Sequence, residues 1–362
     1  MRRLETEFGI CDDAKAWLHS YLKNRSQSVV INGLRSTPRV LDCSLPQGSL
    51  IGPFCFPPYS SHVGKIARKH GVNVHLYADD SQLYMAFYPD EGTAAVDQMM
   101  DCIEEIRNWM EANMLKLNED KTEFMIIASR YEEAKLNDSV HNIRVGDSTV
   151  DSSDTARNIG VMMDSRLNMV KHVNSITSAC YFNLRNISKI RGNLTHEATV
   201  TLVQALVTSR LDSVNGLLYG LPDTLLQKLQ LVQNNAARVI ARVRKHDHIT
   251  PVLINLHWLP VKYRIRYKIS LMAFKCRKGL APAYLCDLIE EHAPSRSGLR
   301  SEVELDLLVE KNGRTKTYGD RAFSVCAPKL WNALPQALRS KKTLDAFKTG
   351  LKTHYFRLAY DV

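Results

Sequence analysis

The chain has 362 residues and a mass of 41.1 kDa, a length that predicts two or three domains. Its composition, with 44% hydrophobic and 24% charged residues, excludes a chain that is disordered throughout. No stretch approaches the ~20 apolar residues of a membrane-spanning helix, and the segment Met1–Glu5 contains no apolar run. We therefore expect neither an integral membrane protein nor a conventionally secreted one, and place the chain inside the cell.

The charge is distributed unevenly along the chain. Residues 1–150 carry a net charge of −5, whereas residues 151–362 carry +15, so the whole surplus of +10 lies in the second part. This asymmetry favours a polyanionic partner for the second part. The alternative is a basic surface that only keeps the protein soluble.

The eight cysteines show no spacing typical of a zinc site, and no histidine pair stands beside them. Isolated cysteines of this kind are typical of small buried residues in a reducing compartment.

The first part of the chain alternates short helical and strand-like segments. The pattern predicts a helix over Ala14–Leu22 capped by Asp12 or Asp13, a strand over Ser28–Ile31 entering an Asn32-Gly33 hairpin turn, an apolar stretch broken by Pro57-Pro58, strands over Val72–Leu76 and Gln82–Phe87, a helix over Thr93–Asn113, a strand over Phe124–Ala128, and a hairpin about Gly146.

Beyond residue 158 the pattern becomes mainly helical. Helices are predicted over Lys171–Lys189, Thr195–Ser209, Asp223–Arg244, Tyr263–Lys278 and Thr343–Tyr355. The fold class predicted is therefore α+β, with an α+β part followed by a helical, basic part and a boundary near residue 165.

Two adjacent carboxylates, Asp79 and Asp80, follow Tyr77-Ala78 between the two predicted strands. Adjacent carboxylates repel each other unless a cation or another partner compensates their charge. Carboxylate oxygens suit Mg²⁺, which can stabilise both the attacking and the leaving oxygens of a phosphoryl transfer. Taken alone, the tetrapeptide is better explained as a polar hairpin turn, because Asp is common in turns.

The surrounding segments decide between these alternatives. Leu45–Pro53 (LPQGSLIGP) precedes the Tyr77–Asp80 tetrapeptide (YADD), and Leu115–Thr122 (LKLNEDKT) and Asn158–Asp164 (NIGVMMD) follow it. In this order and spacing the chain resembles the reverse transcriptases of non-LTR retrotransposons of the LINE-type, jockey-like group. The four segments resemble that family's motifs B, C, D and E, and the resemblance extends to a C-terminal stretch, Asp320–Trp331.

The resemblance implies a role for each matching residue. Asp79 and Asp80 would bind the catalytic Mg²⁺, or Mn²⁺ in its place, and Tyr77 and Ala78 would lie against the primer end. Pro46, Gln47 and Gly48 would contact the incoming nucleotide and the template. Lys121 would assist the leaving pyrophosphate; the alternative for Lys121 is a solvated lysine at a helix end. The implied partners are an RNA template, a DNA primer and deoxynucleoside triphosphates.

One part of the family pattern has no match in this chain. The family carries a further metal-binding Asp on a motif A strand, shortly before the segment that Arg3–Ile10 resembles. Asp12 and Asp13 fit helix-capping positions and Asp42 fits a connecting strand, so none replaces it. The resemblance therefore implies an N-terminally truncated reverse transcriptase that is inactive alone.

A second feature is the basic stretch Arg238–Lys278, in which Asp247 is the one acidic residue. Its aromatic residues fit core packing, whereas its charges fit phosphate contacts. The candidate nucleic-acid-binding residues are Arg238, Arg242, Arg244, Lys245, Lys262, Arg264, Arg266 and Lys268.

We interpret residues 1–165 as a partial reverse transcriptase fingers and palm, residues 166–245 as a thumb-like helical region, and residues 246–362 as a basic C-terminal region. The function expected is that of the C-terminal part of a retrotransposon RNA-directed DNA polymerase. Two alternatives remain, a non-catalytic remnant that binds RNA or DNA and a pseudogene product that does not fold stably.

Overall fold

The computed structural model describes residues 1–41, 48–292, 307–313, 315 and 318–361. The chain divides into two compact units, Met1–Ile159 and Gly160–Val362, and each is described by itself. No helix in these residues is both long and apolar enough to cross a membrane.

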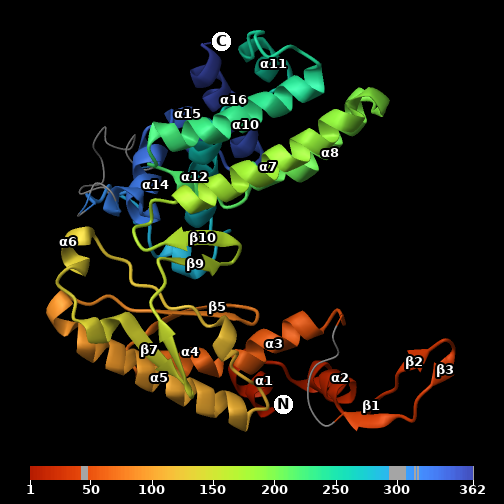
Figure 1. Ribbon diagram of the computed structural model, residues 1–362, viewed down its shortest axis with the longest axis vertical. Coiled ribbons are helices and arrows are strands. Elements are labelled where there is room, and N and C mark those ends of the chain that lie inside the picture. The colour runs from red at the N-terminus through yellow and green to blue at the C-terminus, as the bar shows by residue number, and fades with distance from the viewer. Residues whose placement is uncertain (42–47, 293–306, 314, 316–317, 362) are drawn as a thin grey trace. The chain divides into compact units, whose positions relative to one another are not determined.

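The first unit combines six helices and nine short strands in its described part (Figure 1). The helices are α1 (Arg2–Phe8), α2 (Asp12–Leu22), α3 (Gly52–Ser60), α4 (His62–Lys69), α5 (Gly92–Ala112) and α6 (Arg130–Glu133). The strands are β1 (Arg25–Gln27), β2 (Val30–Ile31), β3 (Leu34–Arg35), β4 (Arg39–Leu41), β5 (Asn73–Tyr77), β6 (Asp80–Tyr84), β7 (Asn142–Val145), β8 (Ser148–Asp151) and β9 (Thr155–Asn158). The pairs β1–β4, β2–β3, β5–β6 and β7–β8 are antiparallel.

Helix α5 connects the two hydrophobic clusters of this unit. Cys102 and Ile106 pack with α4 and Val72, whereas Val96 and Ile103 pack with β7 and Val140. A helix with apolar residues on two faces can bury both, and here each face covers a different hairpin region. The core of the first unit is therefore divided into two small clusters.

The second unit is helical apart from β10 (Val161–Asp164). Its helices are α7 (Val170–Ile190), α8 (His196–Val203), α9 (Ser209–Asp212), α10 (Asp223–Ala241), α11 (Thr250–Asn255), α12 (Val261–Arg277), α13 (Ala283–Cys286), α14 (Phe323–Asn332), α15 (Gln336–Arg339) and α16 (Leu344–Tyr360). One hydrophobic core runs through all its long helices and spans residues 161 to 355.

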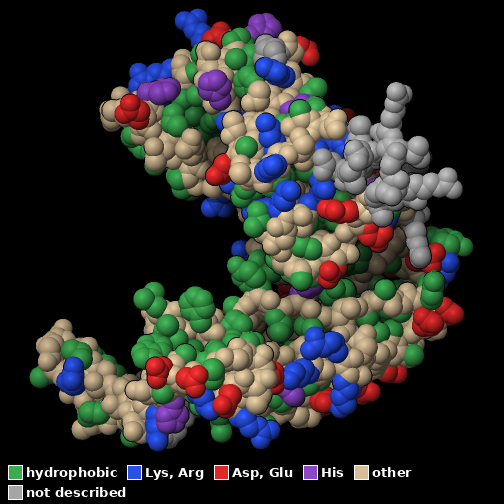
Figure 2. All heavy atoms as spheres, turned by 180° about the vertical axis from the view of Figure 1, so that it is seen from behind, with side chains coloured by type: hydrophobic (Ala, Val, Ile, Leu, Met, Phe, Trp, Pro, Cys, Tyr) green, Lys and Arg blue, Asp and Glu red, His purple; other side chains and the backbone are tan. Residues whose placement is uncertain are grey.

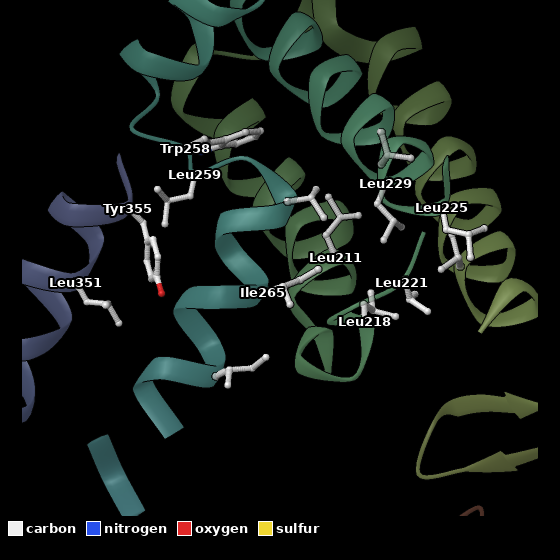
Figure 3. Packing of buried hydrophobic residues seen from close by; sticks show 14 of the residues in the cluster. Leu211, Leu218, Leu221, Leu225, Leu229, Trp258, Leu259, Ile265, Leu351 and Tyr355 are labelled. Carbon is white, nitrogen blue, oxygen red and sulfur yellow. The ribbon is translucent and has the colours of Figure 1, made fainter. Parts of the chain in front are cut away.

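Helix α12 lies at the centre of this core. Figure 3 shows Ile265 of α12 between Leu351 and Tyr355 of α16 on one side and Leu225 and Leu229 of α10 on the other. An aromatic stack at the other end of α12 brings Phe274 to 4.2 Å from Phe347, measured between ring centroids. The α+β fold class predicted from the sequence, with a helical second part, is confirmed.

Several predicted elements differ from those observed. Pro57 and Pro58 lie inside α3 and do not break it. No side chain caps α2, because Asp12 and Asp13 form its first turn. The strand predicted over residues 124–128 is reduced to a single bridge between Phe124 and Ser152.

Two predicted helices in the second unit also differ. The helix expected over residues 195–209 contains a π-helical turn at Gln204–Thr208. Helix α10 ends at Ala241 because Arg242 adopts a left-handed φ of 56°, which stops the helical hydrogen-bond pattern before Arg244.

Five of the cysteines are buried, as their isolated spacing predicts: Cys55, Cys102, Cys180, Cys276 and Cys326. Burial raises the pKa of the last four thiols to about 11, so they remain protonated near neutral pH. Cys11 is exposed and Cys286 half-buried, and Cys43 lies outside the described residues.

Candidate functional site

The Tyr77–Asp80 segment forms the tip of the β5–β6 hairpin. Tyr77 pairs with Asp80 in the strand register, so Ala78 and Asp79 form a two-residue turn. Ala78 adopts a φ of 55°, which costs a non-glycine residue roughly 1–2 kcal/mol. The paired strands hold this turn, and Asp79 and Asp80 both project from it into solvent.

Neither of these carboxylates has a hydrogen bond or an ion pair in the part of the chain that the structure describes. Two adjacent, exposed carboxylates without a protein partner are free to bind a hard divalent cation such as Mg²⁺. The described residues hold no group of three or more His, Cys, Asp or Glu side chains arranged to bind a metal. Asp79 and Asp80 therefore fit Mg²⁺ as a partial ligand set that leaves most positions to water and phosphate oxygens.

Contacts within the first unit support the hairpin from both of its strands. The ring of His75 on β5 stacks on Tyr84 of β6 at 5.2 Å between centroids. The side-chain amide of Asn158 donates to Oε1 of Gln82, two residues after Asp80, at 2.8 Å. From the sequence, Gln82 is predicted only as the start of a strand. Its position two residues after Asp80 is the signal that could have found it, because residues two apart on a strand share a face.

The segment resembling motif B is only partly described. Pro46 and Gln47 lie outside the described residues, so their predicted contacts stay predictions. Gly48 has a φ of 78°, a conformation that favours glycine, and an added Cβ would meet no atom within 4 Å. Its backbone is thus exposed and open to a ligand. Ser49 follows and accepts a hydrogen bond from the Gly52 N–H at the start of α3.

Lys121 is exposed in a short 3₁₀ turn, Glu119–Lys121. Its neighbour Glu119 accepts a hydrogen bond from the Ser148 hydroxyl at 2.9 Å, which ties the turn to β8. Among the described residues, no contact joins Lys121 to Asp79 or Asp80. Lys121 is thus not bonded to the two adjacent carboxylates, and its predicted catalytic role stays a prediction.

The predicted nucleic-acid-binding residues fall into two groups. The first group is engaged within the second unit. Arg264 forms an ion pair with Asp212 at 2.6 Å and donates to the Leu259 carbonyl at 2.9 Å. Arg238 donates to the carbonyls of Arg244 and Asp247 in the loop after α10, and Arg242 donates to the carbonyl of Arg191, which follows α7.

The second group faces solvent. Arg244, Lys245, Lys262 and Lys268 are exposed, and their side chains have no partner within the described ranges. Arg266 is half-buried, with its guanidinium 5.7 Å from the centre of the Tyr263 ring. The basic stretch is therefore not one continuous face, and four side chains remain available for phosphate.

Comparison with known proteins finds a family match that covers the β5–β6 hairpin. Residues 3–182 match the family model described as reverse transcriptase (RNA-dependent DNA polymerase). This part of the chain resembles a reverse transcriptase domain. The matched residues include the whole β5–β6 hairpin and reach into α7.

The chain also resembles a curated protein from Drosophila melanogaster, "Probable RNA-directed DNA polymerase from transposon BS". The two are 25% identical over 191 residues, which make up 51% of this chain and 20% of the relative. The chain thus aligns with about a fifth of that relative's length.

Proposed function

We propose that this chain is part of a non-LTR retrotransposon polymerase that joins deoxynucleotides to a DNA primer on an RNA template. The observation that carries the proposal is the β5–β6 hairpin, which exposes Asp79 and Asp80 at a two-residue turn inside the region that resembles reverse transcriptases. Adjacent carboxylates without a protein partner are costly unless a cation or a phosphate-bound ion compensates their charge.

Asp79 and Asp80 are the residues that would hold Mg²⁺, or Mn²⁺ in its place. When bound, such an ion stabilises the negative charge that develops on the reacting phosphate oxygens. The protein residues position the reactants: the exposed Tyr77 ring lies beside Asp80 in the register and offers a surface for the primer end. Gly48 offers exposed backbone to the nucleotide or template.

We propose further that residues 1–362 alone do not extend a primer. Asp79 and Asp80 have no third metal-binding side chain beside them in the described ranges. Phosphoryl transfer depends mainly on positioning and on charge stabilisation, so a loosely held ion and triphosphate lower its rate severely.

The second candidate function is a nucleic-acid-binding protein without catalysis. The charge of +15 in residues 151–362 and the exposed Arg244, Lys245, Lys262 and Lys268 favour it. Phosphate contacts by such side chains carry no base information, so the expected binding has little sequence preference.

A primer-extension assay with a binding measurement tests both candidates. Purified residues 1–362 are incubated with poly(rA)/oligo(dT), dTTP and either Mg²⁺ or Mn²⁺, and we expect nucleic acid to be bound but no product to form. Asp79→Asn is the matched control, because it removes one charge at an exposed position. Product that disappears in Asp79→Asn would overturn the inactive assignment and establish polymerase activity. A chain that neither extends nor binds would overturn both candidates.

A further inference from the structure

A two-stranded ribbon in the first unit has no role in the function proposed above. It consists of residues 23–41 and contains β1 to β4, and Figure 1 shows β2 and β3 at its far end, away from the helices of that unit. Six residue steps separate Arg25 from Ile31, which makes the ribbon about 20 Å long at 3.2–3.4 Å per residue.

Its turn and register are well defined. Asn32 and Gly33 both have positive φ, 52° and 83°, as a tight hairpin turn requires. Gln27 pairs with Arg39, but Val30 pairs with Arg35, so one strand carries one residue more than the other between these pairs. The extra residue lies beside Pro38 and forms a bulge, which increases the twist of the ribbon.

The ribbon is basic although residues 1–150 as a whole are acidic. Residues 23–41 contain four basic residues, Lys23, Arg25, Arg35 and Arg39, and no acidic one. Arg25 donates to the Leu22 carbonyl at the base of the ribbon. Lys23, Arg35 and Arg39 are exposed, and no side-chain hydrogen bond or ion pair engages them in the described part of the chain.

The far end of the ribbon is apolar. Ile31 and Leu34 face each other across the turn and are 65% and 79% exposed, and Val30 beside them is 57% exposed. Hydrophobic and basic side chains stand side by side on the ribbon in Figure 2. An apolar tip with a basic stem matches a groove that is flanked by phosphates and lined by sugars and base edges.

We propose that residues 23–41 form an arm that lies along a groove of a nucleic-acid duplex. Lys23, Arg35 and Arg39 contact phosphates, and Ile31 and Leu34 enter the groove. The minor groove of an A-form RNA–DNA duplex is wide and shallow and displays sugars and base edges, so a two-stranded β-ribbon can lie in it. The inference rests on the proposed function, since the duplex assigned to the arm is the one on which such a polymerase acts. It adds a second nucleic-acid contact, far in sequence from the exposed basic residues of Arg244–Lys268.

The test measures binding of the whole chain to a fluorescent 20-base-pair RNA–DNA heteroduplex across a salt series. Each phosphate contact contributes about 0.9 to the log–log salt slope on a duplex. We expect Arg35→Ala/Arg39→Ala to reduce the slope by about 2. Lys116→Ala/Arg130→Ala is the matched control, because both residues are exposed basic side chains of the same unit, and it should leave the slope unchanged.

A second variant tests the tip. Ile31→Ser/Leu34→Ser should weaken binding about tenfold with no change in slope, because lost apolar contact releases no counterions. The four substituted side chains are exposed, so the melting temperature should not change.

The outcomes separate this inference from the function on which it rests. Wild-type binding with ribbon variants equal to the control would overturn the arm alone. A wild-type chain that binds no nucleic acid would overturn the proposed function as well. Ribbon variants that lose binding to phosphatidylserine vesicles but keep duplex binding would assign the ribbon to a membrane surface and overturn the arm.

Discussion

Arg264 and the nearby Lys262 and Lys268 share one helix, α12, but the structure predicts opposite effects for them. The Arg264 side chain is only 15% exposed, bonds to Asp212 and the Leu259 carbonyl, and lies 5.8 Å from the Trp258 ring centre. Hydrogen bonds to charged groups contribute about 1.5–3 kcal/mol each. Asp212 is 39% exposed and can be rehydrated when Arg264 is removed, which keeps the loss of folding free energy near the lower end of this range.

We therefore expect Arg264→Ala to destabilise the second unit by about 2 kcal/mol, a fall of about 4–8 °C in its melting temperature. It should leave the salt slope of single-stranded RNA binding unchanged. The double variant Lys262→Ala/Lys268→Ala should do the reverse: a slope lower by about 1.4, at about 0.7 per contact, and a melting temperature within about 2 °C of wild type.

Thermal denaturation followed by circular dichroism, with anisotropy titrations between 50 and 300 mM salt, measures both quantities on the whole chain. A normal melting temperature for Arg264→Ala together with a slope reduced as for the lysines would refute the reasoning. Arg264 would then contact phosphate, and its pair with Asp212 would contribute nothing measurable.

Further predictions concern the fold. Ala78→Gly should stabilise the first unit by about 1 kcal/mol, because glycine adopts the φ of 55° without a Cβ clash; slower hydrogen exchange in β5 and β6 checks it. Phe347→Ala should cost about 3–5 kcal/mol and lower the melting temperature of the second unit, since Phe347 is fully buried. Burial lowers the pKa of His172, so stability is complete above the unfolded pKa of 6.5 and falls as the pH drops below it; His172→Gln should flatten this dependence in melts at pH 7.5 and 5.5. Limited proteolysis should cut Met1–Ile159 before Gly160–Val362, because the first unit divides its core into two small clusters.

Local patterns in the sequence predict much of the fold. The hairpin at Tyr77–Asp80 and the turn at Asn32-Gly33 follow from strand-like residues around a short polar tip, and α5 follows from helical spacing. These elements depend on neighbours within a few residues, which is why they can be predicted from a single sequence.

Contacts between distant residues set the limits of such prediction. Nothing near Arg264 in the sequence indicates that Asp212, 52 residues earlier, will pair with it. The residues 124–128 are apolar enough for a strand, but one bridge from Phe124 to Ser152 is all the pairing they obtain. At Pro57 and Pro58 two backbone donors are missing, yet α3 continues and packs against α1.

The single core of the second unit has a consequence for synthesis on the ribosome. Arg321 donates to the carbonyls of Leu167 and Leu217, and Phe347 packs against Phe274. The face of α12 that packs against α14 and α16 therefore waits for partners made up to about 80 residues after Arg277. At about 5–20 residues per second that delay is roughly 4–16 s, during which this face is open to chaperones or to neighbouring nascent chains. Slower translation through the last hundred codons should lower the soluble yield more than the same slowing in the first hundred.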